Sequence, residues 1–68
     1  MNKISEITGR EYDPAETVAI YNQKQIGKYV ANGAEIVDCG TTADDVFFVL
    51  FDRELTRSLF DAWCKHEL

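Results

Sequence analysis

Apolar and polar positions alternate in three segments of this chain, and that period predicts three β-strands. Thr17–Tyr21 is rich in β-branched and aromatic residues, which favours a strand. Residues 34–40 form the second expected strand, and the apolar run at 46–51 forms the third. Thr41–Asp45 joins the last two, and its side chains are of the kind that bond locally to the backbone in turns. We therefore expect the second and third strands to form an antiparallel hairpin.

Two other segments carry the spacing of an α-helix. The first follows Asn22, an N-cap residue with Gln25 three positions later, and ends at Gly33, placed as a left-handed C-terminal residue. Its apolar face holds Ile26, Tyr29 and Val30. The second is expected to begin at Asp52 as its cap. Its apolar stripe comprises Leu55, Leu59, Ala62 and Trp63, widened by Phe60 and Cys64.

The order strand, helix, strand, strand, helix predicts a small two-layer α+β domain. Each helix has one apolar stripe, so we expect both helices to cover the same face of a three-stranded sheet. All 68 residues make one domain, with 1–16 as an N-terminal arm and 17–68 as the compact core. In the arm, Asp13 and Pro14 are a helix-start signal that predicts either one short turn or the opening of a longer helix reaching Asn32.

The third strand is apolar on both faces, which is unusual for so short a chain. Val46, Phe48 and Leu50 point one way, and Phe47, Val49 and Phe51 point the other. If Gly40 pairs with Asp45 across the turn, the outward set is Phe47, Val49 and Phe51, and these are the candidate interface residues. A one-residue shift in register reverses the two sets. Three covers for the outward face remain open: the arm through Ile4, Ile7 and Tyr12, a second copy of the chain, or a different protein.

Composition and charge narrow the class of protein. The chain is 46% hydrophobic and 28% charged, as in an ordinary globular domain, and its net charge is −5. An acidic balance argues against general nucleic-acid binding and favours a basic partner surface. The N-terminal stretch has no signal-peptide core, and no apolar run is long enough to cross a bilayer. We therefore expect a cytoplasmic protein whose two thiols, Cys39 and Cys64, are reduced.

The chain carries no recognisable catalytic or cofactor motif. Cys64 and His66 are two positions apart on the expected helix, so they do not face each other. The adjacent carboxylates Asp44 and Asp45 fall in the turn, and the cysteines and histidine have no zinc spacing. The glycines match no phosphate-binding loop. We expect no enzyme activity, no catalytic residue, no metal, no cofactor and no small-molecule substrate.

Two pairs of basic residues keep an alternative open. Lys24 and Lys28 lie one turn apart on the first helix, and Arg53 and Arg57 lie one turn apart at the start of the second. Such pairs are usually solvated helix surface, but they are the candidate residues for phosphate contacts if the protein binds nucleic acid.

Several of these features together resemble a group of short uncharacterised proteins. The shared pattern is a strand, a polar cap, a helix ending in Asn-Gly, a second strand, and an aromatic strand leading into a helix with a late Trp. It covers roughly residues 12 to 68, on Val18–Tyr21, Asn22, Gln25, Tyr29, Asn32, Gly33, Ile36–Asp38, Phe48–Asp52, Glu54, Thr56, Trp63 and Leu68. This chain departs from the pattern by one residue, in Phe48–Asp52.

The group is a domain of unknown function found in Gram-positive bacteria, their phages and their mobile elements. The resemblance implies a small cytoplasmic protein of phage or mobile-element type, and it brings no known reaction or ligand. We expect a non-catalytic protein that acts through protein–protein interaction, as an inhibitor of a host defence or nucleic-acid enzyme. The alternatives are a nucleic-acid-binding accessory protein and a homodimeric structural protein without a ligand.

Overall fold

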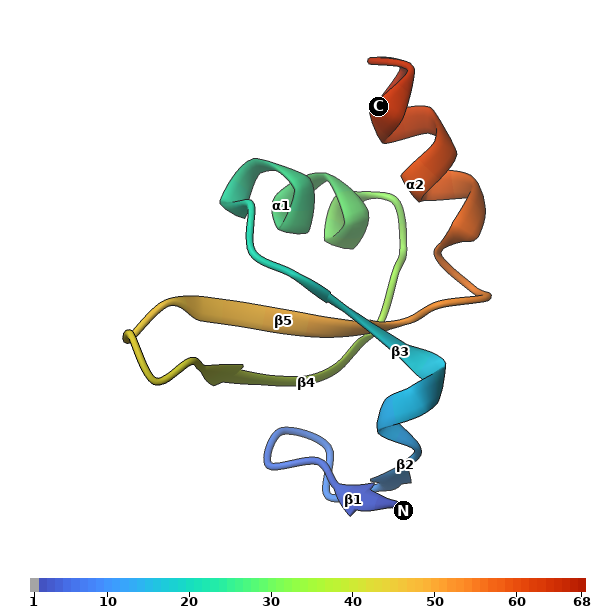
Figure 1. Cartoon of the computed structure of the whole chain (residues 1–68). Coiled ribbons are helices and arrows are strands. Elements are labelled where there is room, and N and C mark those ends of the chain that lie inside the picture. The colour runs from blue at the N-terminus through green and yellow to red at the C-terminus, as the bar shows by residue number, and fades with distance from the viewer. Residues whose placement is uncertain (1) are drawn as a thin grey trace.

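The computed structural model describes residues 2–68 and arranges them around one three-stranded sheet (Figure 1). Both helices lie on one side of that sheet, and a two-stranded N-terminal hairpin lies on the other side. The expected α+β class, with both helices on one face, is confirmed. The elements are β1 (Lys3–Ile4), β2 (Glu11–Tyr12), a 3-10 turn η1 (Pro14–Glu16), β3 (Thr17–Ile20), α1 (Gln23–Ala31), β4 (Ile36–Thr41), β5 (Phe47–Asp52) and α2 (Arg57–Cys64).

The last strand of the chain, β5, occupies the centre of the sheet. The strand order is β3-β5-β4, and β5 pairs antiparallel with both neighbours. β3 and β4 are therefore parallel to each other, joined through α1, with β5 inserted between them. The expected hairpin of the second and third strands is confirmed as β4 and β5.

Helix α1 begins and ends where the sequence predicts. The Asn22 side chain accepts hydrogen bonds from the N–H groups of Lys24 and Gln25. Gly33 has φ +90°. Its N–H donates to the Val30 carbonyl and the Ala34 N–H donates to the Tyr29 carbonyl, and these two hydrogen bonds are those of a Schellman motif. Gln25 does not complete a capping box, because its side-chain amide donates to the Tyr29 hydroxyl at 3.0 Å.

Helix α2 starts later than predicted. Asp52 does cap a turn, since its Oδ1 accepts from the N–H groups of Glu54 and Leu55 at 3.0 and 3.1 Å. That turn is not continued, and α2 begins only at Arg57, with Thr56 as an N-cap that makes no side-chain capping bond. The predicted start was wrong because an aspartate that caps one turn gives the same local signal as one that caps a helix.

The predicted orientation of β5 is wrong. The pairs are Gly40 with Phe48 and Cys39 with Val49, not Gly40 with Asp45. Thr42 and Val46 close a three-residue loop in which Asp45 has φ +62°, the left-handed position that such loops require. The pairing differs from the expected one by three residues, an odd number, so every side chain of β5 changes face.

The core therefore contains the residues that were expected to face outward. Val49 is 2% exposed and Phe51 is fully buried, together with Ile20 and Tyr29. Of the predicted outward set only Phe47 is accessible, at 46%. The irregular register between Ile36 and Asp38 is a bulge, and it allows both Ile36 and Cys39 to pack against this core.

The N-terminal arm covers part of the second face of the sheet, which was one of the three alternatives that the sequence left open. Asp13 and Pro14 make one short turn, and residues 3–12 form a hairpin against the second face of the sheet (Figure 1). Ile4 and Ile7 do not provide the cover, since both remain exposed. The contact is made instead by Ser5, Glu6 and Tyr12 around Asp38.

Candidate interaction surfaces

A short turn before α2 directs one leucine into solvent. In this turn, residues 53–56, the Asp52 carboxylate accepts hydrogen bonds from the N–H groups of Glu54 and Leu55. The N–H and the hydroxyl of Thr56 both donate to the Asp52 carbonyl. Thr56 is buried, but Leu55 is 80% exposed, the most exposed of the large apolar side chains described. Because the turn is fixed by hydrogen bonds at both ends, Leu55 is presented on a defined backbone and not on a loose loop.

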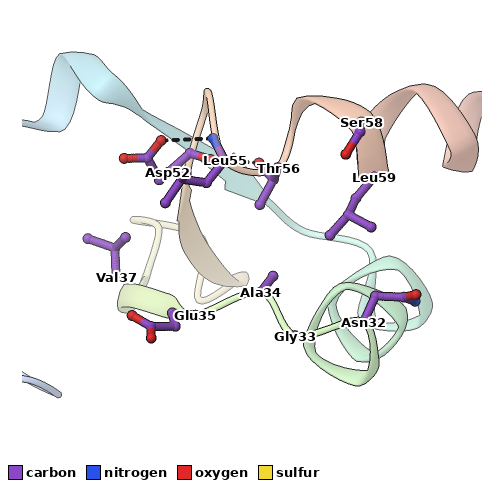
Figure 2. A pocket seen from close by; sticks show the side chains of 10 residues that line it. All are labelled: Asn32, Gly33, Ala34, Glu35, Val37, Asp52, Leu55, Thr56, Ser58 and Leu59. Atoms are coloured by element: carbon purple, nitrogen blue, oxygen red, sulfur yellow. Dashed lines mark hydrogen bonds between the residues drawn. The ribbon is translucent and has the colours of Figure 1, made fainter.

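Leu55 forms one wall of an open groove between the α1–β4 connection and the start of α2 (Figure 2). The groove, called here the acidic groove, has a volume of about 530 Å³. In Figure 2, Glu35, Val37 and Asp52 lie at one end, and Asn32, Ser58 and Leu59 lie at the other. Its lining is Asn32, Gly33, Ala34, Glu35, Val37, Asp52, Leu55, Thr56, Ser58 and Leu59. Two carboxylates and several apolar side chains are thus gathered without a lysine or an arginine.

A second groove lies on the other flank of the α2 start. It has a volume of about 400 Å³ and is called here the arginine groove. Arg53 donates to the Thr17 carbonyl at 3.0 Å, while Arg57 lies 3.9 Å from the Glu54 carboxylate in a well-exposed pair. The lining is Val18, Tyr29, Arg53, Glu54, Thr56, Arg57, Phe60 and Asp61. An apolar floor is thus surrounded by charges of both signs.

The second face of the sheet is held to the N-terminal hairpin by one buried carboxylate. Asp38 is 8% exposed, and it accepts hydrogen bonds from the Tyr12 phenol at 2.8 Å and from the N–H groups of Cys39 and Glu6 at 2.9 and 3.2 Å. Burial raises the pKa of Asp38, but these bonds and the Ser5 hydroxyl outweigh it and hold the pKa below 3.8. The hydrogen bond to Asp38 raises the pKa of Tyr12 above 10.0. This Asp38 network joins the hairpin to the sheet.

Beyond the hairpin, aromatic rings cover part of the same face. The ring centroids of Tyr21 and Phe48 are 5.8 Å apart. Phe48 also lies over Gly40, where an added Cβ would come within 3.1 Å of its ring. Glycine at this position leaves room for the ring over β4, in the manner of an aromatic side chain that covers a glycine on a neighbouring strand.

The structure separates the basic residues that were grouped as a nucleic-acid candidate. Arg53 and Arg57 share the arginine groove, whereas Lys24 is exposed on α1. Lys28 donates to the Leu68 carbonyl at 2.7 Å, so its ammonium group already has a protein acceptor. Arg53 has one as well, in Thr17.

The remaining candidate chemistry is dispersed. Cys39 and Cys64 are free thiols, and across residues 2–68 no three His, Cys, Asp or Glu side chains are placed to hold one metal ion. His66 follows the end of α2 with φ +57°. Within the same described range, no helix is both long enough and apolar enough to cross a bilayer.

Sequence reasoning missed the residues that now stand out. Glu35 and Leu55 were interpreted as parts of a strand segment and a helix stripe, because their proximity depends on how the α1–β4 connection meets the turn at Asp52. Asp38 carried a usable signal: a carboxylate in the middle of an apolar strand needs a buried partner. Its main partner, Tyr12, is 26 residues away, which no local pattern reveals.

Comparison with known proteins adds no relative to this description. The sequence matches no protein-family model and no curated protein, and the fold matches no solved structure.

Proposed function

We propose that this chain is a non-catalytic protein that binds a basic segment of a partner protein in the acidic groove. The observation that carries the proposal is the combination of apolar walls at Val37 and Leu55 with the carboxylates of Glu35 and Asp52, in a groove whose lining has no basic residue. Such a site suits an arginine or lysine side chain next to an apolar one.

The charge of the whole chain supports the same partner class. At −5 the protein attracts a basic surface over a distance of about one Debye length, roughly 8 Å at physiological salt. A basic surface is what an enzyme that handles nucleic acid presents to its substrate. In the phage or mobile-element setting that the resemblance implies, the partner is a host defence or nucleic-acid enzyme in the cytoplasm, inhibited when its basic surface is covered.

Titration with a defined peptide tests the groove directly. The probe is an amphipathic peptide of alternating arginine and leucine, added to isotopically labelled protein and followed by amide NMR shifts. We expect saturable shifts confined to residues 32–37 and 52–59. Leu55→Asp should weaken binding at least tenfold, while Val30→Asp, which also replaces an exposed apolar side chain by a carboxylate but on α1, should leave it unchanged.

Two results would overturn the proposal. One is a set of shifts spread over the whole acidic surface and insensitive to Leu55→Asp, which describes unspecific attraction. The other is retardation of DNA or RNA by the pure protein, lost in Arg57→Asp but not in Leu55→Asp. That result would favour the alternative, nucleic-acid binding through the basic side chains Lys24, Lys28, Arg53 and Arg57.

A further inference from the structure

The arginine groove leaves the packing of α2 incomplete on one flank. Leu59 and Trp63 pack against the core, yet no residue of α2 is buried, and Phe60 on the groove wall is 48% exposed. Among the described residues, the buried hydrophobic core holds only Ile20, Tyr29, Val49 and Phe51. Small domains with so few buried side chains commonly gain stability from association.

The charges around this groove balance, although those of the chain do not. The lining holds Arg53 and Arg57 together with Glu54 and Asp61, so its net charge is zero. The chain has 7 basic and 12 acidic residues, of which the groove contains two of each. The net charge of −5 is therefore carried entirely by the rest of the protein. A strongly acidic or strongly basic partner finds no net attraction there. A second copy of this chain meets no net repulsion at this surface and can pair both signs.

We propose that the arginine groove is the interface of a two-fold symmetric dimer of this chain. A two-fold interface brings the same surface of both copies together, so it must be complementary to itself. Here the α2 helices pack antiparallel, the Phe60 ring of each copy covers Val18 of the other, and Arg57 faces the partner's Asp61. The acidic grooves, on the other flank of α2, remain open in both copies.

The surface is small, as is typical of weak and transient complexes. A standard interface takes about 20–30 residues from each partner, and this groove with its rim supplies fewer. The dimer should therefore be weak, with a Kd in the range of roughly 10–500 μM. Sedimentation equilibrium at loading concentrations from tens of micromolar to about one millimolar covers that range.

The first experiment compares one variant in the groove with one outside it. The mass of the wild type should rise with concentration from the monomer towards the dimer. Phe60→Asp should remain monomeric, and Val30→Asp, with a similarly exposed side chain on α1, should dimerise as the wild type does. A wild type that is monomeric at one millimolar, or a Phe60→Asp protein that still dimerises, would overturn the proposal.

Charge reversal tests the symmetry of the interface. Arg57→Asp alone places two acids opposite each other in a symmetric dimer, and Asp61→Arg alone places two arginines opposite each other, so each variant should be monomeric. An equimolar mixture should form a heterodimer, because both contacts are then oppositely charged. Far-UV circular dichroism establishes that each variant is folded. If the folded variants do not associate on mixing while the wild type dimerises, the two-fold pairing is wrong.

The dimer and the proposed partner site can be tested independently of each other. Phe60→Asp leaves every residue of the acidic groove unchanged, so it should bind the basic peptide as the wild type does. Leu55→Asp should lose the peptide and retain the dimer. If Arg57→Asp instead abolishes retardation of nucleic acid by a protein that is monomeric throughout, the groove is a nucleic-acid site and the dimer is excluded.

Discussion

The phenol of Tyr12 lies 2.8 Å from the carboxylate of Asp38 and donates a hydrogen bond to it across 26 residues of sequence. Tyr12 belongs to the N-terminal hairpin and Asp38 to the edge strand β4. The bond therefore joins two parts of the molecule that no continuous apolar core connects, because Ile4 and Ile7 of the hairpin face solvent.

Removing the phenolic hydroxyl should loosen the hairpin from the sheet. Hydrogen bonds to a charged group contribute about 1.5–3 kcal/mol, so Tyr12→Phe should lower the free energy of unfolding by roughly that amount. Amide hydrogen exchange should accelerate over residues 3–12 more than over β5. Tyr21→Phe, which removes the hydroxyl of a half-exposed tyrosine, is the control and should change neither measurement. Equal protection of the hairpin in Tyr12→Phe and wild type would contradict the role assigned to this bond.

The same pair makes stability depend on pH at both extremes. The pKa of Asp38 lies below 3.8 in the folded protein, so its carboxylate stabilises the fold above that pH, and the contribution falls as the pH drops through the lower folded value. The pKa of Tyr12 lies above 10.0, so the neutral phenol stabilises the fold below pH 10, and this contribution is lost as the pH rises through the higher folded value.

Urea unfolding between pH 2 and pH 11 measures this dependence. The stability advantage of the wild type over Asp38→Asn should be constant near neutrality and should shrink below about pH 4. The advantage over Tyr12→Phe should shrink above about pH 10. An advantage over Asp38→Asn that persists unchanged at pH 2 would show that the carboxylate charge is not what stabilises the hairpin contact.

Two glycines, one inside α1 and one just after its C-cap, should respond in opposite ways to substitution by alanine. At Gly27 an added Cβ meets nothing within 4 Å, so Gly27→Ala should stabilise the protein by about 0.5–1 kcal/mol. Gly33 has φ +90°, where an L side chain is strained, so Gly33→Ala should destabilise by about 1 kcal/mol or more. Thermal unfolding of the two variants provides the comparison, and a shift of the same sign in both would refute it.

The loop between β4 and β5 depends on one left-handed residue. Asp45 has φ +62°, and β-branched residues are disfavoured there by roughly 1–2 kcal/mol, so Asp45→Val should lower stability by that amount. Asp44→Val, at the neighbouring exposed position without a positive φ, is the matched control and should change stability by less than about 0.5 kcal/mol. Chemical unfolding measures the free energy of unfolding of both variants. Equal losses would show that the left-handed backbone of Asp45 is not what disfavours valine there.

The order of elements could be predicted from the sequence because each signal is local. The cap at Asn22, the glycine at 33 and the alternation around β3 act within a few residues of themselves. The face of β5 could not be predicted, because it depends on the conformation of Asp45, and a change of an odd number of residues in pairing reverses Phe47 and Phe48.

The candidate interaction surfaces were harder to predict from the sequence than the face of β5, for a physical reason. Leu55 is exposed only because the turn capped by Asp52 stops before the helix begins, and Glu35 meets it only through the packing of separate elements. Asp38 and Tyr12 find each other across the sheet. Such contacts follow from the three-dimensional arrangement and leave no periodic trace in the sequence.

The central position of β5 has a consequence for how the protein is made. β3 and β4 each pair with β5 and not with each other, so the ribosome releases residues 17–41 before either strand has a partner. Translation adds about 5–20 residues per second, whereas a hairpin of this kind closes in microseconds once both strands are free. The sheet therefore assembles only after residue 52 has emerged from the ribosome, and β3 and β4 remain without a strand partner in the growing chain until then.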